Sequence, residues 1–279
     1  MSAAEGAIVP ARPSGVFAGL QRPAFWRGLA LPALILLVWT LATHLKLVNP
    51  HLLVKPERVI SRAVQEVREG ELFAQLGASL QRDLLGVLLG SVVGVIVGGL
   101  MGLSRTYDRL FGPTFHAAKQ VAIFAWIPLM SVWLGTGEVA KVVFIALAAF
   151  YPVVINTHQG VRGTQREYLE VARAYRFSRA QVLRKVVLPS ALPSLFAGLH
   201  LALIYGWLGT IGAEYLLAPA PGIGNLMISG RESFAMDKVL LGVIIVGAVG
   251  ALLNTLVTRL ETRLLKWRVP SFESRSEGT

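Results

Sequence analysis

The chain has 279 residues, of which 54% are hydrophobic and only 15% charged, and its formal net charge is +11. Soluble domains carry about 25% charged residues, so this composition excludes an ordinary soluble protein and indicates an integral membrane protein. With no cysteine and five widely separated histidines, we expect no disulfide, no metal site and no catalytic residue. The basic residues are spread among loops and chain ends, which argues against nucleic acid as a partner and points to membrane topology.

The first segments are predicted to be a tail, a span and an interfacial helix. Residues 1–24 are rich in Ala, Gly and Pro and lack apolar periodicity, so we expect a flexible cytoplasmic tail. Residues 28–45 form an uncharged run long enough to cross a membrane, and no small-residue cleavage pattern follows, which favours a retained span over a signal peptide. Residues 56–76 have the periodicity of an amphipathic helix lying at the interface.

A second span is expected over residues 84–103, where glycine recurs at every fourth position. In a membrane such an edge lets a neighbouring helix approach closely, so we expect this span to be tightly packed. Glycines that line a solute pathway are the alternative. Arg105 and Arg109 then mark a cytoplasmic loop. The glycines assigned to helix packing are Gly86, Gly90, Gly94, Gly98 and Gly102.

Four more apolar runs follow, and Pro128 is expected to kink the first of them. With a basic segment around Arg263 on the inside and residues 269–279 disordered, the charge pattern gives six spans and two cytoplasmic termini. One transmembrane domain over residues 25–268 accounts for all of them. The four later spans are predicted over residues 121–134, 142–155, 195–217 and 239–258.

A charged island from Thr164 to Pro193 interrupts the apolar sequence. Thr164 followed by Glu167, and Ser178 followed by Gln181, fit the capping box, so we expect two short helices with a bend near Arg176. The second helix should end at a proline, Pro189, which has no amide hydrogen to donate.

The same island has seven basic residues and two acids between Arg162 and Lys185, which marks the cytoplasmic side. Leu169, Ala172 and Tyr175 have the spacing of a small apolar strip that would suit a groove in a partner, with Glu170 paired to neighbouring arginines. The alternative interpretation, a solvated loop whose charges only set the membrane topology, remains possible from the sequence.

Glu170-Val171-Ala172, followed at a distance by Leu188-Pro189, resembles the EAA loop of ATP-binding-cassette (ABC) importer permeases. The resemblance implies that residues 162–188 form a coupling loop that sits in a cleft of a cytoplasmic ATPase. Arg176 stands where that family usually has glycine, and a non-glycine residue in a left-handed helix-ending conformation costs about 1 kcal/mol or more. The implied ATPase-coupling residues are Glu170, Val171, Ala172, Tyr175, Arg176, Leu188 and Pro189.

From Ser79 to Trp267 the order of motifs is similar to the nitrate, sulfonate and taurine group of these permeases, on pieces such as AWIPLMSVWLGTGEVAK and LPSALPSLFAGLHLAL. The resemblance implies an all-α, six-span permease of the type I importer fold in a bacterial inner membrane. It also implies an ABC ATPase dimer that holds ATP and Mg²⁺, a second permease subunit, expected to be identical, and a periplasmic binding protein that delivers a small anion. The chain itself has no phosphate-binding glycine loop, so we expect no cofactor on it.

Lys119 to Ile123 replace a proline-rich run that is common in that group, so an organic anion other than a small sulfonate stays open. Trp126, Pro128 and Glu214 are the candidates for a translocation pathway or gate. For Glu214, at the end of a long apolar run, a gate or helix-packing role is favoured over a solute ligand, and interfacial solvation is the alternative. An aromatic such as Trp126 can equally be an interface anchor.

Two other classes of protein remain as rivals. An ion-gradient-driven carrier would have ionisable residues near mid-span and inverted repeats with broken helices, and the sequence indicates neither. A membrane-embedded hydrolase would need a convergent nucleophile and base or a metal cluster, which the scattered histidines do not supply.

Overall fold

The computed structural model describes residues 23–50, 52–217 and 219–264, which form helices joined by short loops, so the all-α prediction is confirmed. The chain divides into two compact units, residues 1–60 and 61–279. Nearly all of the predicted N-terminal tail and all of the predicted C-terminal tail lie outside the described residues.

The first unit holds α1 (Pro23–His44) and the beginning of α2 (Pro56–Arg68). The indole N–H of Trp39 donates a hydrogen bond to the Val54 carbonyl at 3.0 Å, which ties the loop back to α1. The interfacial helix predicted over residues 56–76 is divided, because Gly70 adopts φ +76° and separates α2 from the helix that follows. Glycine takes that left-handed conformation without steric cost.

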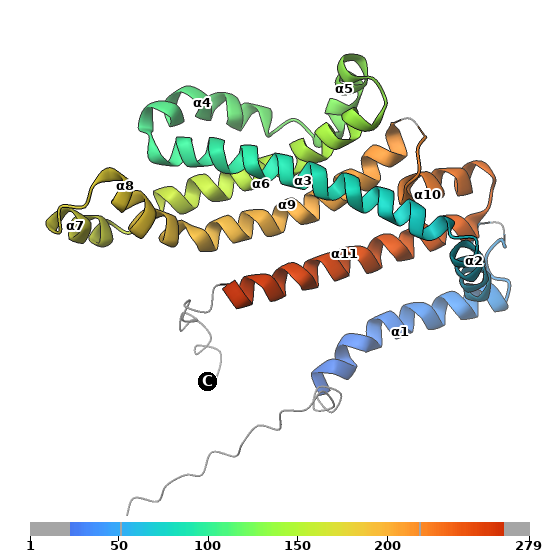
Figure 1. Ribbon diagram of the computed structural model, residues 1–279. Helices are drawn as coiled ribbons and strands as arrows, with labels where there is room; N and C mark the ends of the chain where they lie inside the picture. Colours follow the sequence, from blue (N-terminus) through green and yellow to red (C-terminus); the bar gives the residue numbers. More distant parts are fainter. Residues whose placement is uncertain (1–22, 51, 218, 265–279) are drawn as a thin grey trace, which may run out of the picture. The chain divides into compact units, whose positions relative to one another are not determined.

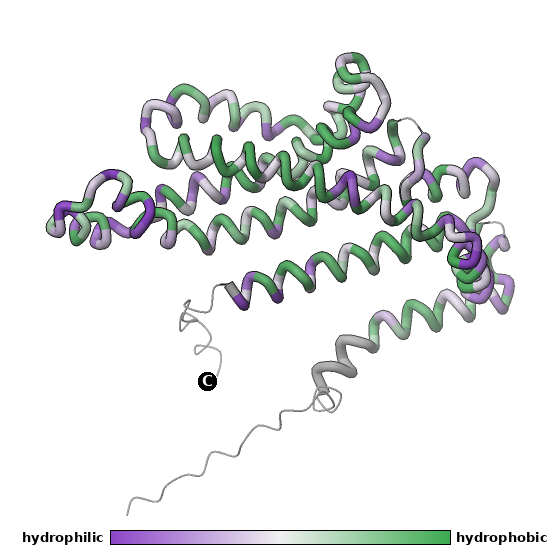
Figure 2. The backbone as a smooth tube through the Cα atoms, viewed as in Figure 1, coloured by the Kyte–Doolittle hydropathy of each residue, from purple (hydrophilic) through white to green (hydrophobic). Residues whose placement is uncertain are grey.

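The second unit is built on three long helices that lie side by side (Figure 1): α3 (Glu71–Leu103), α6 (Glu138–Arg162) and α9 (Leu188–Leu216). Their apolar contacts include a buried cluster in which Val87 of α3 meets Ile145 of α6 and Ala202 of α9. Figure 2 shows these helices as mainly hydrophobic along their length.

The glycine edge of α3 faces α6. A Cβ atom built on Gly86 would lie 2.5 Å from the Ile145 side chain, and one on Gly98 would lie 2.5 Å from the Val154 carbonyl oxygen. A Cβ on Gly90 would collide with the backbone carbonyl of Ala146. These positions therefore allow the two backbones to approach in the way that small residues permit between membrane helices.

The segment after α3 is a broken helix. α4 (Arg105–Ala118) is followed by a short 3-10 turn, η2 (Ile123–Trp126), and by α5 (Ile127–Leu134), and the two halves are bent by 93°. The expectation of a single span over residues 121–134 kinked at Pro128 is therefore wrong, as is the expectation that no helix is broken. The bend lies at residues 119–122, and Pro128 sits in the first turn of α5, where the missing amide hydrogen costs nothing.

Four described helices are long and apolar enough to cross a membrane, or five if the bent pair is counted as one span. In α1 the described apolar stretch, Ala30–His44, is shorter than that criterion. The number of six spans thus remains a prediction.

The long helices extend beyond the predicted spans. α3 begins at Glu71 rather than at residue 84, α6 covers Glu138–Arg162 rather than 142–155, and α9 begins at Leu188 rather than 195. Hydropathy marks only the apolar middle of each helix, whereas the polar ends continue the same hydrogen-bonded ladder.

After α9 the chain forms the short helix α10 (Ile223–Glu232) and the last long helix, α11 (Met236–Leu264). The indole N–H of Trp207 in α9 donates to the Val246 carbonyl of α11 at 3.0 Å, and the His200 ring lies 2.6 Å from Asn254. α11 is accordingly held to α9 by polar contacts as well as by packing.

Candidate functional site

The charged island forms a compact helical turn between the two long helices α6 and α9. It consists of α7 (Arg166–Ala174), α8 (Arg179–Val182) and a π-helical segment, η3 (Leu183–Val187), that leads into α9. It lies at one end of the three-helix bundle (Figure 1), and polar residues concentrate there (Figure 2).

One of the two predicted helix caps is confirmed. Ser178 accepts a hydrogen bond from the Gln181 amide while the Gln181 side chain accepts one from the Ser178 amide at 2.8 Å, which completes a capping box. The cap predicted at Thr164 is wrong, because α7 begins one residue later with Gln165 as N-cap, and the Thr164 hydroxyl donates instead to the Val161 carbonyl at 3.0 Å. Threonine hydroxyls compete for such local backbone acceptors.

The bend predicted near Arg176 is present and has the geometry of a Schellman motif. Arg176 takes φ +51°, the Phe177 amide donates to the Ala172 carbonyl at 2.9 Å, and the Arg176 amide donates to the Arg173 carbonyl at 2.9 Å. Two otherwise orphaned carbonyls at the end of α7 are thereby satisfied. An arginine thus occupies the left-handed position that glycine would take without strain.

The expectation that a helix ends at Pro189 is wrong. α8, η3 and α9 run without interruption from Arg179 to Leu216. The Leu188 amide donates to the Leu183 carbonyl in the wider π pattern just before the proline. In a regular α-helical turn the ring of Pro189 would clash with the carbonyl of the preceding turn. The wider π turn leaves room for the ring, so the helix continues through Pro189.

α7 presents an exposed apolar strip, but not the predicted one. Ala172 is buried against the loop and Leu169 is half-buried, whereas Tyr168, Val171 and Tyr175 are 53%, 55% and 74% exposed. Tyr168 and Val171 border a hollow of about 310 Å³ that also reaches Pro189, and Tyr175 follows them at helical spacing outside its lining. Tyr168 was missed because the sequence alone did not say which face of α7 packs inward.

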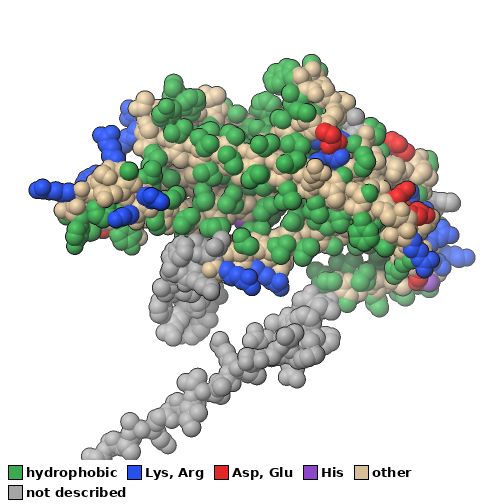
Figure 3. All heavy atoms as spheres, viewed as in Figure 1, with side chains coloured by type: hydrophobic (Ala, Val, Ile, Leu, Met, Phe, Trp, Pro, Cys, Tyr) green, Lys and Arg blue, Asp and Glu red, His purple; other side chains and the backbone are tan. Residues whose placement is uncertain are grey.

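The surroundings of this strip are basic. Glu170 is exposed, and among the described residues no ion pair joins it to Arg166 or Arg173, so the predicted pairing within the helix does not form. Basic side chains gather over this end of the molecule in Figure 3. The exposed basic residues of the turn are Arg166, Arg173, Arg176, Arg179, Arg184 and Lys185.

At the opposite end of the bundle, Arg82 and Glu214 form the centre of a buried ion network. The Arg82 guanidinium donates to Glu214 of α9 at 2.7 Å and to Glu138 at the start of α6 at 2.9 Å. It also donates to the Pro221 carbonyl at 2.6 Å, in the loop before α10. Since α6 rises about 36 Å from Glu138 to Arg162, this network lies roughly that far from α7.

The carboxylate of Glu214 is fully satisfied. Its side chain is 0% exposed, and besides Arg82 it accepts from the Ser79 hydroxyl at 2.8 Å and from the Gly224 amide at 2.9 Å. A Cβ on Gly222 would lie 2.5 Å from the Glu214 carboxyl carbon, so glycine there permits the loop to close over it. Interfacial solvation of Glu214 is excluded by this burial, and the contacts fit a role in holding α3, α9 and α10 together.

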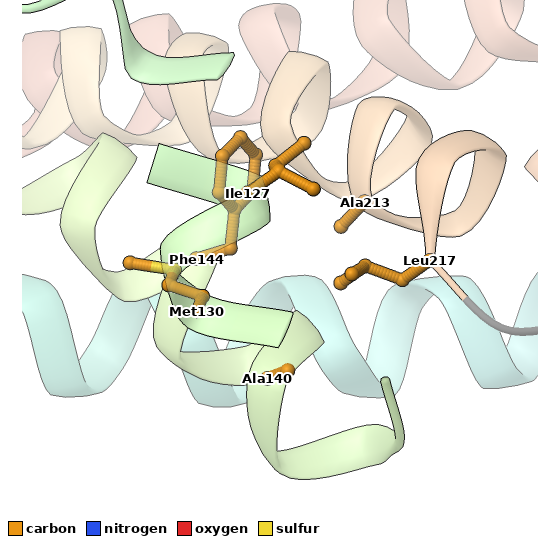
Figure 4. Close-up of a cluster of buried hydrophobic side chains, with 6 residues drawn as sticks. All are labelled: Ile127, Met130, Ala140, Phe144, Ala213 and Leu217. Carbon is orange, nitrogen blue, oxygen red and sulfur yellow. The ribbon is translucent and has the colours of Figure 1, made fainter. Parts of the chain in front are cut away.

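The other two pathway candidates lie elsewhere. Trp126 is half-buried against a cluster that includes Ile127 and Ala213 (Figure 4), and its indole N–H finds no partner among the described residues. Pro128 is exposed. Neither makes a polar contact with Glu214 in the described part of the chain, so the three candidates do not form one site.

Two further charged residues, Asp83 and Lys141, are buried, and sequence reasoning did not single out Asp83. Asp83, at 0% exposure, accepts from the Thr210 hydroxyl at 3.1 Å, and its other carboxylate oxygen has no partner among the residues that the structure describes. Lys141, at 1% exposure, lies 3.6 Å from Glu138 and so balances the charge of the network. The position of Asp83 three residues before Gly86, on the glycine edge of α3, could have indicated its burial.

The apolar helices are long enough to cross a membrane, with an exposed basic turn at one end and a buried ion network at the other, and this arrangement is that of an α-helical integral membrane protein. Within the described ranges no group of three or more His, Cys, Asp or Glu residues is arranged to hold a metal ion.

Comparisons with known proteins specify the family. Residues 87–266 match the model of the binding-protein-dependent transport system inner membrane component, and the chain belongs to that family. It is 38% identical over 250 residues to a protein of Bacillus subtilis strain 168 that carries the provisional name aliphatic sulfonates transport permease protein SsuC, covering 90% of each chain.

Two further relatives carry other solute names. The chain is 35% identical to the taurine transport system permease protein TauC of Escherichia coli K12, covering 84% of this chain and 87% of that one. It is 36% identical to the bicarbonate transport system permease protein CmpB of Synechococcus elongatus, covering 70% of each. A solved structure of the inward-facing methionine ABC transporter MetNI shares the fold, with a TM-score of 0.60 and 20% identity over 71% of this chain and 98% of that one.

Proposed function

We propose that the chain is the permease subunit of an ATP-driven ABC importer and that it moves a small anion, of the sulfonate, taurine, nitrate or bicarbonate kind, into the cell. Membership in the family of binding-protein-dependent inner membrane components supports the transport role. The relatives' names for sulfonates, taurine and bicarbonate support an anionic solute. The chain makes and breaks no covalent bond in this account, and ATP and Mg²⁺ are held by a separate subunit.

The observation that carries the proposal is the surface of α7. Its exposed strip of Tyr168, Val171 and Tyr175 stands on a basic turn next to Glu170, which forms no ion pair with any described residue. A short helix with an apolar strip suits a groove of a partner protein, as in helix-in-groove recognition. The concentration of arginine favours the cytoplasmic side, where an ATPase could reach it.

The path from this surface into the membrane is a single helix. Arg179–Leu216 is continuous over 38 residues, or about 57 Å, and its far end carries Glu214. Because α9 is tied at that end to Arg82 of α3 and to the Gly224 amide of α10, a displacement at α7 would be felt by the ion network. Alternation between inward-open and outward-open packings would follow from such rigid-body motion.

The remaining parts of the proposal follow from the same scheme. Six spans with both termini in the cytoplasm, in a bacterial inner membrane, put the ion network near the outer surface. A periplasmic binding protein would deliver the solute at that end. A second permease subunit, identical to this one, would complete the pathway, and an ABC ATPase dimer would dock on the two copies of α7.

A charge reversal at Glu170 tests the proposal. In proteoliposomes that contain the full complex, we expect Glu170→Lys to abolish ATP-dependent uptake of the anion and the stimulation of ATP hydrolysis by the loaded binding protein. Glu167→Lys, one turn earlier and also exposed, changes the net charge equally and is the matched control. The protein level in the membrane should be equal for both variants.

Normal stimulated ATP hydrolysis and uptake in Glu170→Lys would contradict the proposed coupling role. Uptake by the purified chain without any ATPase would contradict the proposal as a whole and favour a carrier driven by an ion gradient.

A further inference from the structure

The break between α4 and α5 opens onto a cavity of about 590 Å³ in the second unit. Its walls are residues 119–124, which include the break and the first turn of η2, and the middle turns of α6 and α9. Tyr151 is the fourteenth of 25 residues in α6, and Tyr205 is the eighteenth of 29 in α9, so the cavity lies near mid-length of the bundle.

In the proposed topology, with α4 starting at the membrane surface, the break also lies deep within the membrane. α4 begins at Arg105 and is 14 residues long, which corresponds to a rise of about 21 Å, whereas a bilayer core is about 30 Å thick. Backbone that leaves the helical pattern at this depth is tolerated only where protein surrounds it or where it lines a polar cavity. Interrupted membrane helices at mid-depth are also where transporters commonly bind solutes.

A single cation stands at this break. Lys119 is the C-cap of α4, lines the cavity and is half-buried, and it makes no ion pair with any residue that the structure describes. The described residues that line the cavity include no Asp or Glu. Only the partial negative charge at the C-terminus of α4 offsets the lysine. An ionisable residue inside a membrane domain with no protein counter-ion indicates a binding site for the opposite charge.

The polar groups near Lys119 add donors. Gln120, Asn156 and Tyr205 line the cavity, and Tyr205 is 49% exposed with no hydrogen bond from its hydroxyl among the described residues. Tyr151 lines it too, but its hydroxyl donates to the Ala118 carbonyl at 3.5 Å. The Asn156 amide uses one N–H on the Pro152 carbonyl at 2.8 Å and keeps a second. A sulfonate or carboxylate oxygen is an acceptor for such donors.

The rest of the cavity is apolar and large. The Phe124 ring packs against Gly212, where an added Cβ would collide with it. It also packs against the Phe144 ring at a centroid distance of 5.8 Å. Together with Leu201 and Leu208, Phe124 lines the apolar part of the cavity. A volume of 590 Å³ lies within the range of sites that hold drug-sized molecules. An ion of the size of nitrate or bicarbonate would leave most of this apolar wall exposed.

We propose that this cavity, with Lys119 at its polar end, binds an organic anion that carries an apolar body, such as an arenesulfonate or a longer alkanesulfonate, in preference to a small inorganic anion. Lys119 and the neighbouring amide and phenol groups hold the anionic head, and Phe124 and the leucines contact the body. The proposal rests on the proposed transport function and specifies the class of solute for it.

Direct binding to the permease tests this assignment independently of the binding protein. The full chain in complex with its ATPase is placed in nanodiscs of zwitterionic lipid and titrated calorimetrically with benzenesulfonate, hexanesulfonate and methanesulfonate, with empty nanodiscs subtracted. We expect benzenesulfonate and hexanesulfonate to bind at least tenfold more tightly than methanesulfonate. Lys119→Gln should lower the affinity for each of the three anions roughly tenfold, since a charge-assisted hydrogen bond is lost.

Matched variants separate the cavity from general effects. Arg109→Gln removes an exposed cation from the same helix outside the cavity, and Ala117→Trp adds bulk to an exposed position outside it. Both should bind like the wild type. Ala122→Trp, at an exposed position in the cavity lining, should remove the preference for the larger anions.

Equal affinities across the three sulfonates, or equal effects of Lys119→Gln and Arg109→Gln, would overturn the assignment. Loss of benzenesulfonate binding when phosphatidylglycerol is added to the nanodiscs would also overturn it, in favour of a lipid headgroup site. These results are distinct from failure of the transport proposal, which is measured by the Glu170 variants. Selective binding together with no ATP-driven uptake would refute the importer and leave the cavity assignment standing.

Discussion

The close approach of α3 to the α6 backbone gives a quantitative prediction at Gly90. An added Cβ there would collide with the carbonyl group of Ala146, which belongs to the α6 ladder and has no rotamer by which to move away. Overpacking costs about 1–3 kcal/mol, and a contact with backbone belongs at the upper end, whereas alanine gains about 1 kcal/mol over glycine in helix propensity. We therefore expect Gly90→Ala to destabilise the protein by about 2 kcal/mol.

Gly99 supplies the matched control on the same helix. A Cβ at Gly99 meets nothing within 4 Å, so Gly99→Ala should be neutral or should stabilise by up to about 1 kcal/mol. The six tryptophans report unfolding by intrinsic fluorescence in a thermal scan. Gly90→Ala should melt roughly 4 °C or more below the wild type and Gly99→Ala at or above it. Equal melting temperatures for the two variants would refute the close approach of α3 and α6.

Two other changes probe the ends of the bundle. Arg82→Ala leaves Glu214 buried without its cationic partner, so we expect a loss of about 3 kcal/mol or more in the same thermal assay, and Arg82→Met together with Glu214→Leu should recover much of it; additive losses would contradict a direct pair. Arg176→Gly relieves the left-handed strain at φ +51°, so the free energy of unfolding should rise by about 1 kcal/mol and the melting temperature should rise slightly. Arg176→Val should lower the melting temperature. Equal melting temperatures for the two variants would contradict the Schellman geometry.

Several features of the fold could be predicted from the sequence because they depend on local chemistry. Hydropathy identified the apolar core of each long helix, and the Ser178 and Gln181 pair identified the cap of α8. The resemblance to a family that usually has glycine at the position of Arg176 pointed to the left-handed residue that ends α7. These signals lie within a few residues of one another, so no knowledge of tertiary contacts was needed.

The features that failed depend on contacts distant in sequence or on backbone adjustments. A proline ends most helices, but the π turn before Pro189 removes the steric clash of its ring with the preceding turn. The break between α4 and α5 falls at residues 119–122, ahead of the proline that seemed to mark a kink. For Glu214 the sequence favoured a gate or helix-packing role but left interfacial solvation open, because its partner Arg82 lies more than one hundred positions earlier in the chain.

The apolar strip of α7 was predicted on the wrong face of the helix, and its role in coupling stays a prediction. The spacing of Leu169, Ala172 and Tyr175 and that of Tyr168, Val171 and Tyr175 are both compatible with one side of a helix. Burial of Ala172 beneath the turn decides between them. The sequence has Lys119 to Ile123 where the related permeases have a proline-rich run, and this difference led us to expect a difference in the solute. The same residues line the cavity at the break.

The most direct test of the account asks on which side of the membrane α7 lies and whether it touches an ATPase. The chain has no cysteine, so Glu170→Cys gives a single thiol at an exposed position. With a membrane-impermeant maleimide we predict labelling in inside-out vesicles stripped of the ATPase, protection when the ATPase is added back, and no labelling in intact spheroplasts. Labelling of Glu170→Cys in intact spheroplasts would place α7 on the outer surface and contradict the account.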